Sequence, residues 1–229
     1  MKKLETAEFK EMIFRGLISQ GVLKTPNVIQ ALRTVPREEF VLEEFRNEAY
    51  VDTPLPIGYN QTISAIHMVA MMCEALNLEP GNKVLEIGSG SGYHAAVVAE
   101  IIAPMDSEKT GHVYTLEIIP EVAEYAKKNL RKTKYDDRAT VICADGSKGY
   151  PEKAPYDKIL VTASAPKVPP PLIDQLKVGG LLVIPVGNIY VYQQLLLVKK
   201  EKENETKTTH LCDVAFVPLM GEHGWKTTR

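Results

Sequence analysis

The sequence predicts an α/β fold, a doubly wound and mostly parallel sheet with helices on both faces. Short apolar segments alternate with amphipathic segments through the middle of the chain, which is typical of parallel strands joined by helices. A glycine-rich turn lies between the first of these strands and its helix. Near the end of the chain the alternation stops, and two β-rich segments follow one another across a polar turn.

Length and composition limit the class of protein. The chain has 229 residues, which fits a single domain, and 45% of them are hydrophobic, enough for a substantial core. A net charge of −2 argues against nucleic-acid partners, because binding phosphates needs a basic face. No apolar run is long enough to span a membrane, and the charged start at Met1 and Lys2 does not resemble a leader.

The cysteines and histidines show no pattern of disulfide or metal chemistry. Cys73, Cys143 and Cys212 are odd in number and far apart, which favours small core residues and a reducing cytoplasm. The five histidines do not have the spacing of metal ligands, so we expect no metal.

Residues 1–60 are predicted to be a mostly helical extension of a core that spans residues 61–229, both within one domain, 1–229. Apolar residues at helical spacing and Pro26 after Thr25 indicate the first two helices. We expect helices over 4–20, 26–35 and 37–46, and irregular structure over 53–61.

The core is predicted to contain five parallel strands and a C-terminal antiparallel hairpin. The expected strands are 84–87, 113–116, 140–143, 156–162 and 180–184. The expected helices are one that opens at Ser64 and those over 94–102, 120–132 and 171–176. The hairpin strands are 193–200 and 207–219, around the polar turn 201–206.

The glycine-rich turn favours a cofactor without a pyrophosphate. Gly88, Ser89, Gly90 and Gly92 follow a strand and precede a helix, where glycine lets a ligand approach the backbone closely. Tyr93 stands where the dinucleotide fingerprint G-x-G-x-x-G has its last glycine. S-adenosylmethionine has no phosphate and would suit the shorter G-x-G-x-G turn. An ordinary tight turn between strand and helix is the alternative.

Three acidic positions support this interpretation. Glu117 ends the next strand, where its carboxylate could accept hydrogen bonds from two ribose hydroxyls or could simply be solvated. Asp145 and Gly146 follow the strand after that, near the expected position of the adenine amino group. Glu86 lies inside an apolar strand, where a buried charge is costly, so we expect a cationic partner such as the cofactor's ammonium group.

Several longer motifs resemble one family. Residues 144–159 read ADGSKGYPEKAPYDKI, residues 54–58 read PLPIG, and residues 61–68 read QTISAIHM. Together with FVPL at 216–219 and GW at 224–225, they resemble the protein-L-isoaspartate O-methyltransferases over nearly the whole chain. Asn60 and Ile66 depart from the family pattern, which has glycine and proline at those places, and they put the geometry of the substrate loop in question.

The resemblance implies a Rossmann-like methyltransferase fold and a repair reaction. The carboxylate of an isoaspartyl residue in a damaged protein would take a methyl group from S-adenosyl-L-methionine, leaving S-adenosyl-L-homocysteine. The resulting ester closes to a succinimide that partly reopens to aspartate. The resemblance also implies a cytosolic monomer.

The candidate site residues follow from these motifs. Because a carboxylate with a pKa near ~4 is already ionised, the reaction needs alignment and exclusion of water rather than a general base. Ser64 would orient the substrate carboxylate, although it could instead be a helix N-cap. His67 is a candidate substrate contact or a packed histidine. The other contacts implied are Thr62 and Ile63 with the cofactor, and Val217, Pro218 and Leu219 with the substrate backbone.

Two other classes of function stay open. The first is a methyltransferase of the same fold that acts on a small molecule or on RNA, although the charge argues against RNA. The second is a module that binds the cofactor without turnover. Tyr93 and His94 open the helix after the glycines, where they could border the cofactor, but we expect them to pack in the core.

Overall fold

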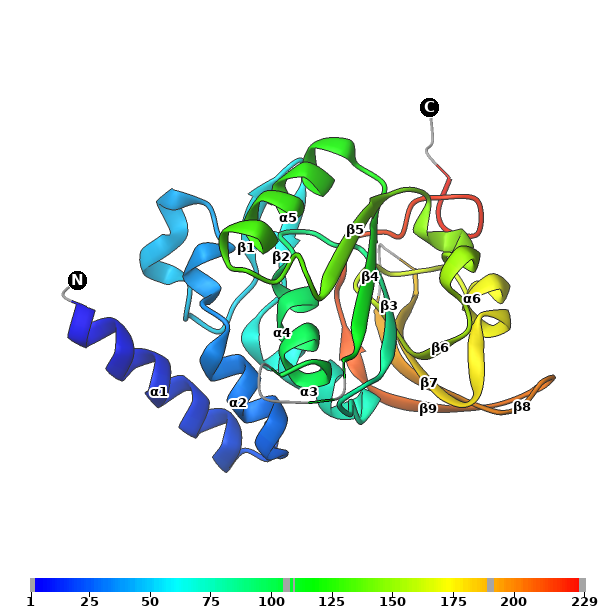
Figure 1. Ribbon diagram of the computed structural model, residues 1–229, viewed down its shortest axis with the longest axis horizontal. Coiled ribbons are helices and arrows are strands. Elements are labelled where there is room, and N and C mark those ends of the chain that lie inside the picture. The colour runs from blue at the N-terminus through cyan, green and yellow to red at the C-terminus, as the bar shows by residue number, and fades with distance from the viewer. Residues whose placement is uncertain (1–2, 105–107, 109, 189–191, 227–229) are drawn as a thin grey trace.

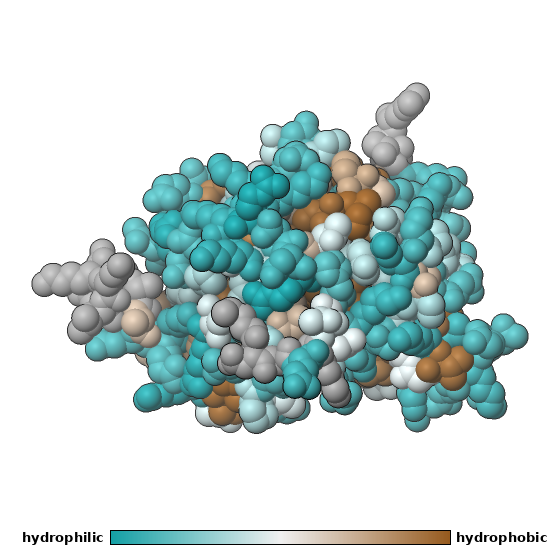
Figure 2. All heavy atoms as spheres, viewed as in Figure 1, coloured by the Kyte–Doolittle hydropathy of each residue, from teal (hydrophilic) through white to brown (hydrophobic). Residues whose placement is uncertain are grey.

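The computed structural model describes residues 3–104, 108, 110–188 and 192–226 of the chain. The prediction that the chain has no leader rested on the charged start at Met1 and Lys2, and these two residues lie outside the described ranges. Figure 1 shows a central twisted sheet with most of the helices on one side of it. The face seen in Figure 2 is largely hydrophilic, with apolar residues gathered in small patches. Within the described residues, no helix is both long and apolar enough to cross a membrane.

Seven strands of the described chain form the main sheet, in the order β5-β4-β3-β6-β7-β8-β9. The first five are mutually parallel, whereas β8 pairs antiparallel with β7 and with β9, as the sequence predicts. Their bounds are β3 Lys83–Ile87, β4 His112–Glu117, β5 Ala139–Cys143, β6 Tyr156–Val161, β7 Leu176–Gly187, β8 Gln193–Lys202 and β9 Glu205–Val214. The predicted sheet with its C-terminal hairpin is therefore confirmed.

Helices lie on both faces, but unequally. The α-helices are α1 Lys3–Ser19, α2 Pro26–Thr34, α3 Ile66–Leu76, α4 Tyr93–Ile102, α5 Pro120–Lys132 and α6 Pro170–Asp174. The described chain also contains four short 3-10 helices, namely η1 Arg37–Glu39 and η2 Glu43–Glu48 between α2 and β1, and η3 Gly146–Lys148 and η4 Pro151–Lys153 between β5 and β6. In Figure 1, α3, α4 and α5 lie on one side of the sheet and α6 lies on the other.

The apolar strands are buried on both faces. Val84 and Leu160 belong to the larger apolar cluster, which also contains side chains of the α1–α5 layer. Leu85 follows Val84 in β3, and Ile159 precedes Leu160 in β6. Both belong to the second apolar cluster, which also contains Leu172 of α6. Neighbouring residues of a strand point to opposite faces, which explains why these strands have no polar alternation.

The prediction that residues 53–61 are irregular was wrong. Residues Leu55–Gly58 form β1 and Gln61–Ile63 form β2, which pair as a two-stranded antiparallel hairpin. Tyr59 and Asn60 at its turn have φ of 54° and 57°. Asparagine tolerates this left-handed conformation better than most residues, so it can replace the glycine of the family pattern here.

Two further boundaries differ from the prediction. The segment expected to be a helix over 37–46 contains two 3-10 helices instead of an α-helix. The helix expected to open at Ser64 begins at Ile66, with Ala65 as the N-cap residue, so Ser64 is not the N-cap. Ile66 occupies the first helical position and is fully buried, so apolar packing replaces the rigidity that proline would provide.

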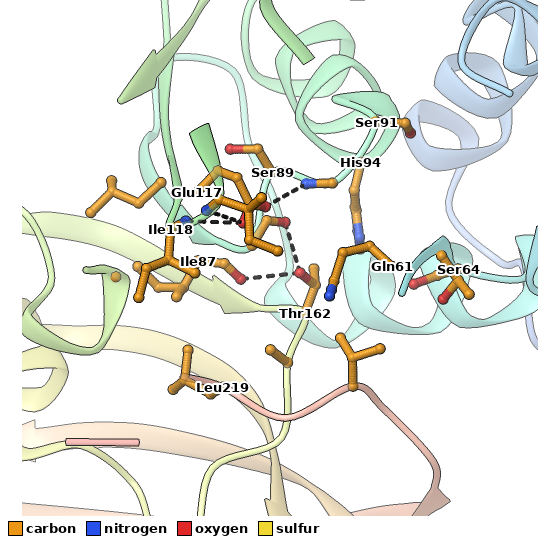
Figure 3. A pocket seen from close by; sticks show the side chains of 18 of the residues that line it. Gln61, Ser64, Ile87, Ser89, Ser91, His94, Glu117, Ile118, Thr162 and Leu219 are labelled. Atoms are coloured by element: carbon orange, nitrogen blue, oxygen red, sulfur yellow. Dashed lines mark hydrogen bonds between the residues drawn. The ribbon is translucent and has the colours of Figure 1, made fainter. Parts of the chain in front are cut away.

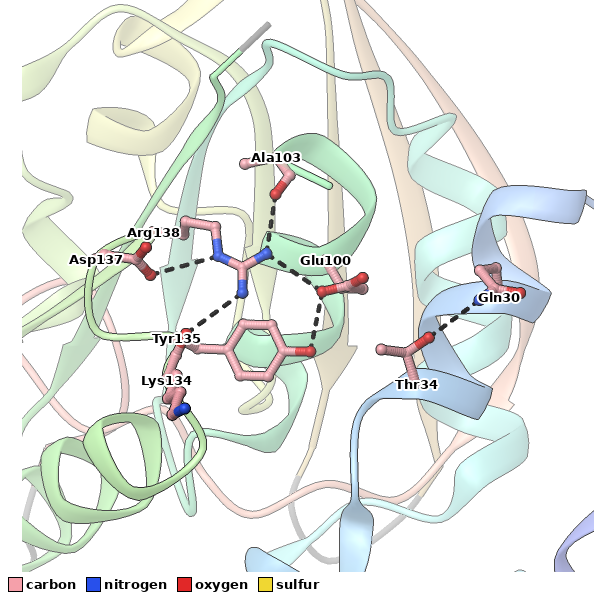
Figure 4. A network of polar contacts seen from close by, with 8 residues as sticks. All are labelled: Gln30, Thr34, Glu100, Ala103, Lys134, Tyr135, Asp137 and Arg138. Carbon is pink, nitrogen blue, oxygen red and sulfur yellow. Dashed lines mark hydrogen bonds and ion pairs between the residues drawn. The ribbon is translucent and has the colours of Figure 1, made fainter. Parts of the chain in front are cut away.

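A polar network ties the connection between α5 and β5 to the end of α4 (Figure 4). Arg138 donates to the Glu100 carboxylate at 3.2 Å and to the Ala103 carbonyl at 2.9 Å. The Tyr135 hydroxyl donates to the same Glu100 oxygen at 3.0 Å. The Ala103 carbonyl lies at the C-terminal end of α4, where the helix itself offers it no hydrogen-bond donor. The network supplies one in a largely buried place.

Candidate active site

A cavity lies where the carboxyl ends of β3, β4, β5 and β6 meet (Figure 3). From β3 the chain first builds the sheet to one side, through β4 and β5, and then returns to add β6 and β7 on the other side. Open α/β sheets bind ligands at such a switch point. Most residues that the sequence assigns to the site line this cavity, namely Thr62, Ile63, Ser64, Gly88, Ser89, Gly90, Glu117, Gly146, Val217, Pro218 and Leu219.

The three glycines of the turn have different functions. Gly88 has a φ of +95°, and a Cβ there would lie 2.3 Å from Thr162 Oγ1, so only glycine fits between β3 and β6. Gly90 has a φ of +51° and lines the cavity. Gly92 does not line the cavity. A Cβ there would face Ala126 and Leu130 of α5, so this glycine allows α4 and α5 to pack closely.

Glu117 is fixed at the cavity wall rather than solvated. Its carboxylate accepts hydrogen bonds from three backbone amides, those of Gly90 at 3.2 Å, Ile118 at 2.9 Å and Ile119 at 3.1 Å. Only 7% of the residue is exposed. The turn therefore presents a preoriented carboxylate to a ligand in the cavity, because its position is set before a ligand arrives.

Glu86, one residue before Ile87 of the cavity wall, does not itself line the cavity. It is fully buried, and neither carboxyl oxygen has a hydrogen-bond partner in good geometry among the described residues. Burial raises the pKa of Glu86 to about 8, and the charge of Glu117 adds to the rise, while the Thr115 hydroxyl opposes it. A raised pKa favours the protonated, uncharged form, which lowers the cost of burying this carboxyl group, and a contact with the cofactor's ammonium group stays a prediction.

Asp145 also lies outside the cavity lining, whereas Gly146 is part of it. One Asp145 oxygen accepts from the Ser147 amide at 2.9 Å and from the Ser147 hydroxyl at 2.7 Å. The other accepts from the Glu222 amide at 2.9 Å. Burial raises the pKa of Asp145, but these hydrogen bonds outweigh it and hold the pKa below the usual value. A contact with adenine stays a prediction for this residue.

A second cavity adjoins the first, and the two share Thr62, Ser64, Thr162 and Val217. Ser64 is half-buried, and its hydroxyl makes no hydrogen bond with the described residues. In Figure 3, Ser64 and Gln61 lie on the side of the first cavity opposite Glu117. The hydroxyl is thus free to bind a ligand at the junction.

His67 lines the second cavity and is not a packed core residue. Its backbone amide donates to Asp52 Oδ1 at 2.9 Å, and its Nδ1 lies 3.0 Å from the same oxygen. Asp52 therefore satisfies an amide at the start of α3 and orients the imidazole. Sequence reasoning missed Asp52, which lies 15 residues before His67.

Val217, Pro218 and Leu219 follow β9 rather than extend it. The Val217 carbonyl accepts from the Ser164 amide at 2.8 Å, and the Leu219 amide donates to the Ser164 carbonyl at 2.8 Å. These two groups are not available to a peptide. Within the described chain, the Val217 amide and the Pro218 carbonyl have no hydrogen bond, so they are the groups that a bound peptide could pair with.

Other lining residues were not assigned to the site from the sequence. Thr162 lines the cavity and directly follows β6, as Gly88 directly follows β3. Because ligands bind at the carboxyl ends of parallel strands, this position could have been assigned to the site from the sequence. Tyr93 and His94 are buried as expected, and they also border the cavity, which was the alternative left open for them. Burial, and then the nearby Arg37, lowers the pKa of His94 to about 3, so the ring is neutral. The remaining additions are Gln61, Val69, Ile87, Ser91, Leu116, Ile118, Ile119, Ala163 and Met220.

Comparison with curated proteins finds close relatives over nearly the whole chain. A Staphylothermus marinus protein named protein-L-isoaspartate O-methyltransferase is 62% identical over 206 residues, which cover 90% of this chain and 91% of the relative. A Hyperthermus butylicus protein of the same name is 55% identical over 221 residues, covering 96% of this chain and 91% of the relative.

Solved structures agree with the sequence relatives. A structure named protein-L-isoaspartate O-methyltransferase is 31% identical with a TM-score of 0.83, covering 94% of this chain and 67% of that chain. A candidate enzyme of this kind from Plasmodium falciparum, solved with S-adenosyl-L-homocysteine, is 28% identical with a TM-score of 0.80, covering 91% and 97% of the two chains. The sequence profile of the protein-L-isoaspartate(D-aspartate) O-methyltransferase family matches residues 7–224, and the chain belongs to that family.

Proposed function

We propose that this chain is a protein-L-isoaspartate O-methyltransferase, which methylates the carboxylate of isoaspartyl residues in damaged proteins with S-adenosyl-L-methionine. The observation that carries the proposal is the junction of two cavities at Ser64 and Thr162. Methyl transfer requires a donor and an acceptor held in separate sites whose reactive ends meet. Membership of the family agrees with this arrangement.

The first cavity fits S-adenosyl-L-methionine. Gly88 and Gly146 let the segments that form its wall pack closely, since a Cβ on Gly88 would collide with Thr162 and a Cβ on Gly146 would lie 2.5 Å from Ile87. We assign the Glu117 carboxylate to the ribose hydroxyls, because carboxylate oxygens are strong acceptors and this one is held in place. Thr62, Ile63, Ser89 and Gly90 would form the rest of the wall. When bound, the cofactor supplies a methyl group on a positively charged sulfur and leaves as S-adenosyl-L-homocysteine.

The second cavity would receive the isoaspartyl peptide. The Ser64 hydroxyl would donate to one oxygen of the substrate carboxylate and leave the other oxygen directed at the first cavity. The carboxylate is ionised at neutral pH and needs no general base. The protein contributes alignment and a site with little water, in which the nucleophile is less solvated and therefore more reactive.

The other residues of the second cavity would hold the peptide. His67, oriented by Asp52, would border the isoaspartyl residue. At the edge shared with the first cavity, the Val217 amide and the neighbouring Pro218 carbonyl would pair with the peptide backbone, since both are otherwise unpaired among the described residues. Hydrogen bonds of this kind recognise an extended backbone whatever its side chains, which suits an enzyme that meets damage in many sequences.

The test is a methyl-transfer assay on a synthetic isoaspartyl peptide, with mass spectrometry to locate the methyl ester. We expect one methyl group on the isoaspartyl carboxylate and matching release of S-adenosyl-L-homocysteine. Binding of the cofactor in a calorimeter without any methyl transfer would contradict the proposal and favour a binding module.

The assembly and location of the protein stay predictions. We propose that the protein is a cytoplasmic monomer and has no nucleic-acid partners. The net charge of −2 supports the absence of nucleic-acid partners. Sedimentation equilibrium of the purified chain tests the monomer, and a stable dimer at micromolar concentration would contradict it.

A further inference from the structure

The segment Val217–Trp225, called the strap below, lies along both cavities. Val217, Pro218, Leu219 and Met220 line the first cavity, and Val217 also lines the second. The strap is part of the red end of the ribbon in Figure 1, and Leu219 faces the first cavity in Figure 3. A ligand in either cavity would therefore contact the same short segment of chain.

The inner part of the strap is held by Ser164, which follows β6. Ser164 exchanges two backbone hydrogen bonds of 2.8 Å with Val217 and Leu219. The indole Nε1 of Trp225 donates to the Ser164 carbonyl at 2.9 Å, and the Trp225 amide donates to the Leu219 carbonyl at 2.7 Å. These bonds fold the strap back on itself so that its two ends lie near Ser164.

The outer part of the strap is held by Asp145 and its neighbour Ser147. The Glu222 amide donates to Asp145 Oδ2 at 2.9 Å, and the His223 amide donates to Ser147 Oγ at 3.0 Å. Gly221 has a φ of +142°, and a Cβ there would lie 2.1 Å from Asp145 Oδ1. The strap is thus pressed against the Asp145 carboxylate with no space for a side chain between them.

We propose that Asp145 is a positioning residue that keeps the strap closed over the cofactor and so sets how long S-adenosyl-L-methionine or its product stays bound. The inference rests on the proposed function for the identity of the ligand. A carboxylate that accepts several N–H and O–H groups makes stronger hydrogen bonds than a neutral acceptor, so Asp145 is suited to anchor a segment without regular secondary structure. The exposed ion pair of Lys148 with Glu222 lies at the same place and is expected to add little.

The test changes the strap rather than Asp145, because Asp145 adjoins Gly146 of the cavity wall and its loss would mix two effects. Gly221→Ala pushes the strap off the carboxylate by the collision described above. Gly179→Ala is the matched control, since Gly179 also has a positive φ of +82° but nothing within 4 Å of an added Cβ. Ser147→Ala is a second variant, which adds no bulk and removes both the strap contact with His223 and the hydroxyl's hydrogen bond to Asp145.

Two measurements report on the strap and on the ligand separately. Trp225 is the single tryptophan of the chain, so quenching of its fluorescence by acrylamide measures how well the strap is docked. Stopped-flow competition measures the dissociation rate of S-adenosyl-L-homocysteine from the same full-length proteins. Thermal unfolding without ligand shows whether Gly221→Ala costs more stability than its control.

We expect Gly221→Ala to raise both the quenching of Trp225 and the ligand dissociation rate, the latter by about tenfold, the effect of losing one hydrogen bond to a charged group. Ser147→Ala should change both in the same direction by less, and Gly179→Ala should change neither. An unchanged dissociation rate with an exposed Trp225 would overturn the inference, as would a Trp225 that stays protected in both strap variants. Failure of the wild-type protein to bind S-adenosyl-L-homocysteine would instead overturn the proposed function, and the inference with it.

Discussion

Replacing Gly88 by alanine should damage the cofactor cavity through one identifiable collision. The new Cβ would lie 2.3 Å from Thr162 Oγ1, so the two atoms must separate by about 1 Å to reach ordinary contact. Overpacking of this kind costs about 1–3 kcal/mol, and the φ of +95° adds about 1–2 kcal/mol of backbone strain for a residue with a Cβ. We therefore expect a loss of about 2–5 kcal/mol in the free energy of unfolding, together with weaker binding of S-adenosyl-L-homocysteine.

A double-mutant cycle separates the two contributions. Thr162→Ala removes the colliding hydroxyl, and the nearest atom to the new Cβ at position 88 is then the Cβ of position 162, at 3.6 Å, an ordinary contact. Urea unfolding of the single and double variants should therefore give a favourable coupling of about 1–3 kcal/mol between positions 88 and 162. Costs that add within about 0.5 kcal/mol would refute the argument that glycine is needed for the approach of β6.

Three more predictions test other parts of the structure. Ser64→Ala should lose most turnover while its calorimetric affinity for S-adenosyl-L-homocysteine stays within about twofold, and an unchanged turnover would remove Ser64 from the reaction. Because the pKa of Glu86 is raised to about 8, the folded state binds its proton more tightly than the unfolded state, so stability should fall as pH rises from about 4.5 to about 8. Glu86→Gln should flatten that fall in urea unfolding curves, and an identical slope would contradict the assignment. Arg138→Met should cost about 2–3 kcal/mol of unfolding free energy by leaving Glu100 with only Tyr135, without changing ligand affinity, and a loss under about 0.5 kcal/mol would show that the network is dispensable.

Features that depend on neighbouring residues were predictable from the sequence. The helix Pro120–Lys132 was expected with the bounds that the structure has, because a proline start and an amphipathic pattern define it locally. The glycine turn was recognisable for the same reason. The hairpin of β1 and β2 was not, since two prolines and a glycine hide the alternation that buries Leu55, Ile57 and Ile63.

Contacts between distant segments could not be predicted in this way. The strap meets Asp145 across 77 residues of sequence, and Asp52 caps α3 from another loop. Gly146 of this motif lines the cavity, yet the Asp145 carboxylate faces Ser147 and Glu222. Position in a motif indicated which end of the sheet the residue lies at, but the direction of its side chain depends on which segments the fold brings against it.

The specificity constant for an isoaspartyl peptide, relative to its twin with normal aspartate, tests the central claim most directly. Both peptides carry a carboxylate at the damaged position and differ in the path of the backbone, which the second cavity would recognise through Ser64 and Val217, with Pro218 of the adjoining cavity beside them. We predict methylation of the isoaspartyl peptide and essentially none of its twin. Equal methylation of the two peptides would contradict the proposed substrate, even if S-adenosyl-L-methionine is consumed.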